Sequence, residues 1–283
     1  MSTGRFLHEL VGSMSQGAAG NPTVAVIEAA FRHHGLHWRY VNMEVLPADL
    51  ANAVRGARAM GFRGFNLSMP HKVDVVPLLS GLGESAALIG AVNCVVLRDG
   101  QFIGENTDGK GFLTSLRSVI DPAGKRVVLF GAGGAARAVA VELALAGAAH
   151  ITVVNRSEDR GGELVETLRV RAKVAAELVP WRGEYTVPAN ADVVINATSI
   201  GLYDAEAQLA LDVGSLRPGM VVADVVFSPP RTRLLRDAEA CGCTVLDGLG
   251  MLVNQGVIGV EYWTGVTPDA AVMRRALEEA LDL

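Results

Sequence analysis

The chain has 283 residues, half of them hydrophobic and 5% aromatic, with a formal net charge of −5. Its length predicts two domains, and its 32 glycines fit an α/β enzyme in which strands and helices meet through tight turns. No block of Lys or Arg is present, which argues against a nucleic-acid or anionic-membrane surface. No long apolar stretch occurs and the N-terminus is charged, so we expect a cytoplasmic protein.

The first part of the chain predicts alternating strands and helices, an order that favours a parallel sheet. A Ser-, Gly- and Asn-rich loop is expected at 13–22. The predicted strands are 6–12, 38–45, 64–68, 91–97 and 101–105, the last two forming a hairpin. The predicted helices are 22–34, 48–59, 73–79 and 111–119. We assign residues 1–112 to an N-terminal α/β substrate domain.

A Pro-Gly linker at 121–124 precedes a different pattern. Nearly unbroken apolar strands are expected at 126–130, 151–154, 192–196, 221–224 and 244–246, with helices at 135–146 and 160–169. Apolar strands that alternate with helices are typical of a doubly wound sheet, so residues 122–252 form the expected Rossmann domain. The final helices, 252–265 and 268–281, have no strand after them. We expect residues 253–283 to pack back on the first domain.

The strand at 126–130 leads into a glycine-rich turn, Gly131 to Ala136. Backbone N–H groups at such a turn, together with the N-terminus of the next helix, can bind a pyrophosphate. After the second strand, Asn155, Arg156 and Ser157 stand where NAD-selective folds carry an acidic residue. Arg156, Ser157 and Arg160 suit a 2′-phosphate and predict NADP. The alternatives are a plain strand-to-helix turn and surface arginines paired with neighbouring acids.

The best catalytic candidate is Lys72, which follows a strand and a Met-Pro-His turn. A lysine in a cleft can donate or accept a proton, and Asp108 is its natural partner; alone, such a lysine is more often a solvated surface cation. Amide and hydroxyl groups suited to a small polyhydroxylated substrate come from Asn66, Ser68, Asn93, Asn106, Thr107 and Gln255. The three cysteines are too few for a disulfide framework or a zinc site, and no metal is expected.

Seven segments in this order resemble the shikimate dehydrogenase family: 66–72, 90–93, 104–109, the Gly131 loop, 155–157, 196–199 and 247–255. The resemblance implies reversible, NADPH-dependent reduction of 3-dehydroshikimate to shikimate, with Lys72 and Asp108 as the catalytic pair. It implies substrate contacts from Thr23, Asn66, Ser68, Asn93 and Gln255. The implied cofactor contacts are Gly131, Ala132, Gly133, Gly134, Ala135, Asn155, Arg156, Ser157, Arg160, Thr198, Gly248 and Met251. We expect a monomer or homodimer.

Two departures from the family pattern concern the substrate. The serines that usually bind its carboxylate fall on Asn21 and Thr23, although Ser13 and Ser15 offer a second Ser-x-Ser. A family tyrosine is Phe227 here. These changes leave open a quinate/shikimate or related cyclohexane-carboxylate dehydrogenase and, from another class, a non-catalytic NADP- or metabolite-binding module.

Overall fold

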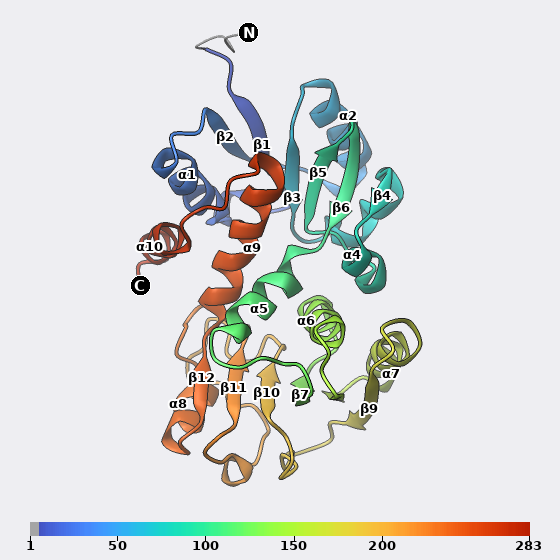
Figure 1. The fold of residues 1–283 in the computed structure, drawn as a ribbon, viewed down its shortest axis with the longest axis vertical. Helices are drawn as coiled ribbons and strands as arrows, with labels where there is room; N and C mark the ends of the chain where they lie inside the picture. The colour runs from blue at the N-terminus through green and yellow to red at the C-terminus, as the bar shows by residue number, and fades with distance from the viewer. Residues whose placement is uncertain (1–5) are drawn as a thin grey trace. The chain divides into compact units, whose positions relative to one another are not determined.

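A computed structural model describes residues 6–283 and divides the chain into two compact units (Figure 1). The first unit extends to Thr107 and takes up Gly256–Leu283, while the second comprises Asp108–Gln255. The divisions fall within α5 (Thr107–Arg117) and α9 (Gly248–Thr264). No helix within 6–283 is both long and apolar enough to cross a membrane.

The sheet of the first unit has the strand order β2-β1-β3-β5-β6-β4. Its strands are β1 (Glu9–Ser15), β2 (Trp38–Glu44), β3 (Gly64–Leu67), β4 (Gly81–Leu82), β5 (Cys94–Arg98) and β6 (Gln101–Glu105). β1, β2 and β3 are parallel, but β5 runs antiparallel to β3 and forms the expected hairpin with β6. The sheet is therefore mixed rather than wholly parallel.

The first strand lies three residues later than the sequence pattern predicts. Phe6 and Leu7 are exposed, whereas Ser13, Met14 and Ser15 are buried within β1. Polar serines are accommodated in a buried strand because hydrogen-bonding side chains surround its end. Ser13 and Ser15 are therefore strand residues and not part of a surface loop.

Helices cover the first sheet, and all except the one at 84–89, which was not predicted, begin within two residues of the predicted positions. They are α1 (Thr23–His33), α2 (Leu50–Ala59), α3 (His71–Asp74), α4 (Glu84–Ile89) and α10 (Ala270–Ala280), with short 3-10 turns at 18–20, 47–49 and 76–78. α10 lies beside α1, so the C-terminal helix packs on the first unit (Figure 1). Met14, Phe62 and Phe65 contribute to one hydrophobic core of this unit.

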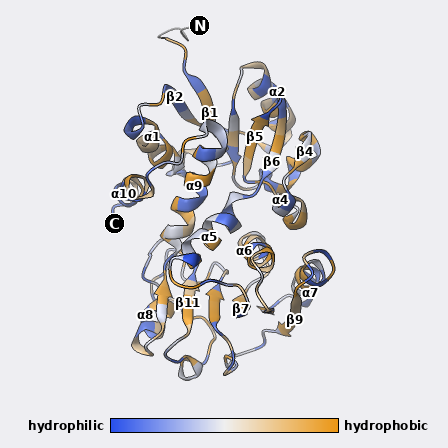
Figure 2. Cartoon of the chain, in the orientation of Figure 1, coloured by the Kyte–Doolittle hydropathy of each residue, from blue (hydrophilic) through white to orange (hydrophobic). Residues whose placement is uncertain are grey.

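The second unit contains a parallel sheet of order β12-β11-β10-β7-β8-β9. The strands are β7 (Arg126–Phe130), β8 (His150–Asn155), β9 (Ala175–Pro180), β10 (Val193–Asn196), β11 (Val221–Asp224) and β12 (Thr244–Leu246). Their hydrophobic residues colour most of the sheet orange in Figure 2. Such runs occur where helices cover both faces of a parallel sheet.

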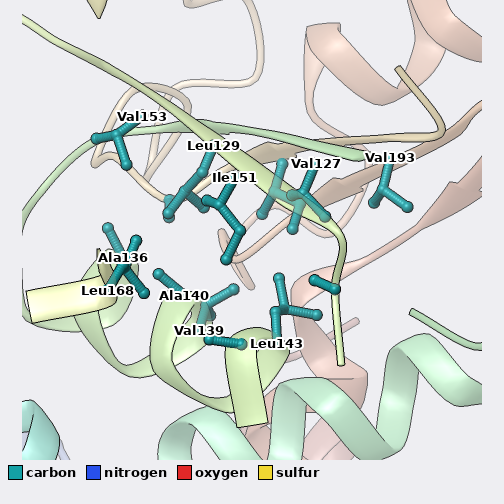
Figure 3. Packing of buried hydrophobic residues seen from close by; sticks show 14 of the residues in the cluster. Val127, Leu129, Ala136, Val139, Ala140, Leu143, Ile151, Val153, Leu168 and Val193 are labelled. Carbon is teal, nitrogen blue, oxygen red and sulfur yellow. The ribbon is translucent and has the colours of Figure 1, made fainter. Parts of the chain in front are cut away.

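Two hydrophobic clusters, one on each side of that sheet, hold the second unit together. One includes Val127, Leu129 and Ile151 from the strands and Val139 and Leu143 from α6 (Gly134–Leu145), as Figure 3 shows. The other is built partly from α8 (Arg233–Ala240). α7 (Glu158–Glu166) and the π-helical turn that follows it, 167–171, complete the unit, with a 3-10 turn at 213–215.

Glycines let α5 pack tightly within the second unit. A Cβ on Gly109 would come 2.3 Å from the Ala138 carbonyl oxygen of α6, and one on Gly111 would come 2.6 Å from the Gln255 backbone nitrogen of α9. Larger residues at these positions would force the helices apart. α5 also begins four residues before the predicted start, which places Asp108 in its first turn.

Candidate active site

Polar side chains gather where β1, β2 and β3 end, and they bond mainly to one another. The Ser13 hydroxyl donates to Asn42 Oδ1 at 2.8 Å and accepts from Asn21 Nδ2 at 3.3 Å. The Tyr40 hydroxyl donates to Asn66 Oδ1 at 2.8 Å, and burial raises the Tyr40 pKa. We call Ser13, Asn42, Asn66 and Asn93, with residues 16–22, the polar edge.

Asn66 and Asn93 join β3 to the start of α5. Asn66 Nδ2 donates to the Asn93 carbonyl oxygen at 3.0 Å, while Asn93 Oδ1 accepts from the Thr107 backbone N–H at 2.6 Å. Both asparagines are buried. An amide has two N–H donors, so the second N–H of Asn66 can bind a substrate oxygen. Ser68, the residue that follows β3, is only partly buried.

Residues 16–22 are held by their own contacts. Asn42 Nδ2 donates to the carbonyl oxygens of Ala18 and Asn21 at 3.2 and 3.0 Å. Asn21 Oδ1 in turn accepts from the Thr23 N–H at 3.0 Å. The two residues that replace the family's serines thus meet each other, and the Asn21 amide is engaged at both its oxygen and its nitrogen.

A carboxylate of the protein occupies the start of this loop. Glu44, the last residue of β2, accepts hydrogen bonds from the backbone N–H groups of Gly17 and Ala18 at 2.7 to 3.0 Å. These bonds lower the pKa of Glu44, which is therefore ionised at neutral pH. Donors that could serve an incoming anion are already used by this side chain.

Lys72 belongs to the first unit and lies in α3, directly after β3 and the Met-Pro turn. Its neighbour His71 is buried, and His71 Nε2 lies 2.8 Å from the Val45 carbonyl oxygen. The Lys72 carbonyl oxygen accepts from the Val92 N–H at 2.8 Å, and the Gln16 N–H donates to the Met69 carbonyl oxygen at 3.3 Å. The lysine turn is thus fixed to the polar edge.

Asp108 and Gln255 are the first and last residues of the second unit. Asp108 lies in the first turn of α5, where a carboxylate is stabilised by the helix dipole. Gln255 is buried in α9, and its Nε2 donates to the Leu252 carbonyl oxygen at 3.1 Å. The carboxylate and the glutamine therefore come from two helices of this unit.

The glycine turn of the second unit fits a dinucleotide phosphate. Gly131 has φ +107°, and a Cβ there would come 2.8 Å from the Ala197 carbonyl oxygen, so only glycine suits the position. At Gly133 and Gly134 a Cβ would meet no atom within 4 Å. Gly133 is the N-cap of α6 and provides no side-chain cap, so the first N–H groups of this helix can face an anion.

The other predicted cofactor residues lie at loops around the same sheet. Arg156 and Arg160 are exposed after β8, and the Ser157 hydroxyl caps α7 by accepting from the Arg160 N–H at 3.3 Å. Glu158 pairs with Arg182 at 2.6 Å. Thr198 Oγ1 donates to Asn196 Oδ1 at 2.7 Å.

Two further predicted residues lie at the start of α9. Met251 packs against the hydrophobic cluster of the second unit that includes Val127 and Leu129. A Cβ on Gly248 would come 2.3 Å from the Val226 carbonyl oxygen, so this position requires glycine. Phe227, the residue after Val226, is partly buried.

A buried carboxyl group that sequence reasoning did not single out lies beside these residues. Asp224 accepts hydrogen bonds from Asn196 Nδ2, Thr232 Oγ1 and the Val226 N–H at 2.8 to 3.0 Å. Burial nevertheless raises its pKa from 3.8 to about 6. Its contacts join the ends of β10 and β11 to the start of α8, which indicates a structural role.

Metal ligands are not grouped in the described part of the chain: within 6–283, no cluster of three or more His, Cys, Asp or Glu side chains could hold an ion. The candidate residues of the first unit offer amides, hydroxyls and a lysine. Those of the second unit offer a carboxylate, an amide and a glycine turn that can bind phosphate. Such groups are suited to binding a small polar molecule and to proton transfer.

Three family models match the chain in succession. They are described as the shikimate dehydrogenase substrate binding domain (residues 22–95), shikimate / quinate 5-dehydrogenase (115–227) and the shikimate 5′-dehydrogenase C-terminal domain (248–278). A shikimate dehydrogenase (NADP⁺) from Methanopyrus kandleri is 40% identical over 277 residues, covering 96% of both chains.

Two solved structures show the same fold. The ligand-free 5-ketofructose reductase of Gluconobacter sp. strain CHM43 is 56% identical, with a TM-score of 0.95, covering 97% of this chain and 99% of the other. The shikimate 5-dehydrogenase of Thermus thermophilus, in complex with NADP(H) and shikimate, is 33% identical with a TM-score of 0.83, covering 96% and 100%. The expected two-domain α/β architecture with a Rossmann-type sheet is confirmed.

Proposed function

Because this chain belongs to the shikimate dehydrogenase family, we propose that it is an NADP-dependent dehydrogenase that interconverts 3-dehydroshikimate and shikimate. The observation that carries the proposal is the attachment of the Lys72 turn to the polar edge, through the hydrogen bond from the Gln16 N–H to the Met69 carbonyl oxygen. This attachment supports a role for the lysine beside amide groups that suit hydroxyl recognition. The glycine turn of the second unit provides the matching phosphate cradle.

In this proposal, Lys72 and Asp108 handle the proton of the reacting hydroxyl. During reduction, Lys72 donates a proton to the carbonyl oxygen as that oxygen gains negative charge, and Asp108 orients the resulting hydroxyl. NADPH supplies the hydride when bound. Asn66, Ser68, Asn93, Thr23 and Gln255 position the substrate. A cytoplasmic enzyme that acts as a monomer or homodimer belongs to the same proposal.

The cofactor would be held chiefly by backbone groups. Gly131 to Ala135 would contact the pyrophosphate, since the turn offers N–H groups without side-chain obstruction. Arg156 would pair with the 2′-phosphate, because a guanidinium can bind phosphate oxygens in a bidentate manner. Asn155, Ser157 and Arg160 border the adenosine, while Thr198, Gly248 and Met251 border the nicotinamide side.

A direct test is to incubate the purified protein with 3-dehydroshikimate and NADPH, follow NADPH oxidation and identify the product. We expect one shikimate for each NADPH consumed. A protein that binds NADPH but turns over no ketone would instead be the non-catalytic binding module.

A second candidate substrate is 5-ketofructose, on which the 56% identical Gluconobacter enzyme acts by name. The reason lies in the loop expected to hold a carboxylate. Residues 13–23 contain no Lys, Arg or His, and the Glu44 carboxylate already uses two of the loop's N–H groups. An incoming carboxylate would meet a like charge and few free donors, whereas an uncharged ketose would not.

The ratio of kcat/KM between 5-ketofructose and 3-dehydroshikimate separates the two candidates. A ratio well above one assigns the enzyme to the neutral sugar, and a ratio well below one assigns it to the carboxylate substrate. Quinate in the oxidative direction tests the remaining cyclohexane-carboxylate alternative.

A further inference from the structure

A pocket of about 300 Å³ lies entirely within the second unit, beside Arg156. Ligand pockets occupy roughly 300 to 1,000 Å³, so this one fits part of a dinucleotide. Its lining comes from the segments after β8, β9 and β10: Arg156, Trp181, Arg182, Gly183, Ile200, Gln208 and Ala210. The residues after β9 and Gln208 have no role in the function proposed above.

Trp181 forms a rigid wall of this pocket. Its backbone N–H donates to the Asn155 carbonyl oxygen at 3.0 Å, and its indole Nε1 donates to the Ala210 carbonyl oxygen at 3.0 Å. The indole also packs edge-on against buried Phe130, with ring centroids 5.2 Å apart. Phe130 is the residue immediately before the glycine turn. The tryptophan is therefore fixed next to the phosphate cradle, at the carboxyl end of β7.

Two guanidinium groups line the same pocket, and a carboxylate restrains one of them. Arg182 pairs with Glu158 at 2.6 Å, across side chains that are 81% and 54% exposed. Such a pair is weak in water, so a doubly charged phosphate can compete with Glu158 for the guanidinium. Arg160, by contrast, does not line the pocket.

We propose that Arg182 is a second ligand for the 2′-phosphate of NADP, beside Arg156, and that Trp181 is the wall against which the adenine packs in this pocket. This inference rests on the proposed NADP dependence and names residues that the family resemblance does not. Arg182 then distinguishes NADP from NAD, and Glu158 weakens NADP binding by holding Arg182.

The test measures binding without turnover. Adenosine 2′,5′-bisphosphate and adenosine 5′-monophosphate, which differ in the 2′-phosphate, are titrated by calorimetry into the full-length protein. Arg182→Gln should weaken the bisphosphate about tenfold, the loss of one charge-assisted bond, and leave the monophosphate unchanged. Glu158→Gln should tighten the bisphosphate a few-fold. Arg231→Gln, which breaks a comparable exposed pair with Glu239, is the matched control.

A second readout uses the tryptophans. Trp38 and Trp263 belong to the first unit, so Trp181 reports on the second. Adenosine 2′,5′-bisphosphate should quench fluorescence in the native protein, and Trp181→Phe should abolish that response. The pocket assignment is overturned if Arg182→Gln weakens both nucleotides equally or neither. If the native protein binds no NADP at all, the proposed function itself fails.

Discussion

The polar edge of the first unit differs from the glycine turn of the second, Gly131 to Gly134, which we call the cofactor edge, in how hydrogen-bonding groups are satisfied. At the polar edge, Ser13, Asn21 and Asn42 bond to one another, and Glu44 takes the loop's N–H groups. At the cofactor edge, Gly133 caps α6 with no side chain, and a Cβ on Gly133 or Gly134 would meet no atom within 4 Å. We therefore expect pyrophosphate binding to depend on backbone shape and substrate choice to depend on which side chains remain available.

The largest expected effect comes from removing the proposed acid, Lys72. Lys72→Met should lower kcat by roughly 10²- to 10⁴-fold, the usual contribution of a positioned proton donor, and leave the Kd for NADP unchanged. Steady-state kinetics and calorimetry measure the two quantities. Lys125→Met, which alters an exposed lysine near Asp192, is the control. A Lys72→Met variant with near-normal kcat would exclude the mechanism.

A pH titration probes the buried carboxyl group of the second unit. Folding raises the pKa of Asp224 from 3.8 to about 6, so the folded state binds a proton more tightly than the unfolded state. The free energy of unfolding should therefore fall, relative to Asp224→Asn, as pH rises from about 4 to about 6. The expected difference is on the order of 3 kcal/mol. Urea unfolding of both proteins at several pH values measures it; parallel curves would contradict the assignment.

Tyr40→Phe tests whether the hydrogen bonds of the polar edge orient Asn66. Losing the buried bond to Asn66 Oδ1 should cost about 1 kcal/mol of stability and raise KM for the substrate, while KM for NADPH stays the same. Thermal unfolding and steady-state kinetics provide the two values. Tyr203→Phe, at a residue that is 76% exposed, should change neither. Equal rises in both KM values would mean that the two edges are not separate.

The smallest expected effect is that of Glu44→Gln on substrate preference. Removing this exposed charge should raise kcat/KM for 3-dehydroshikimate by about two- to fivefold relative to 5-ketofructose. Added salt should reduce the difference, because exposed charges are screened. Glu279→Gln, an exposed acid on α10, should leave the ratio unchanged. No change with Glu44→Gln at low salt would remove Glu44 from substrate selection.

These contrasts also explain what could be predicted from the sequence. The strands β7, β8, β10 and β11 are unbroken apolar runs, and the glycine turn has its own signature, so the second unit was largely foreseeable. β9 and α8 were missed because β9 has Glu177 at its centre and α8 is rich in charged residues. Without β9, the sequence did not indicate that Trp181 and Arg182 would lie beside Arg156.

The substrate side was less predictable for a physical reason. Ser13 and Ser15 looked like loop residues because polar side chains seldom fill buried strand positions. The Glu44 contacts join residues 26 and 27 positions apart, and no local pattern encodes them. The types of side chain at this edge were foreseeable, but the bonds that already occupy them were not.

We propose that this member of the family reduces a small polyhydroxylated ketone with NADPH. The most direct measurement is kcat/KM for 3-dehydroshikimate and for 5-ketofructose, each with NADPH and with NADH. We predict turnover of at least one ketone and a clear preference for NADPH with whichever ketone reacts. A preference for NADH would contradict the role of Arg156, and no turnover in any of the four combinations would contradict the account.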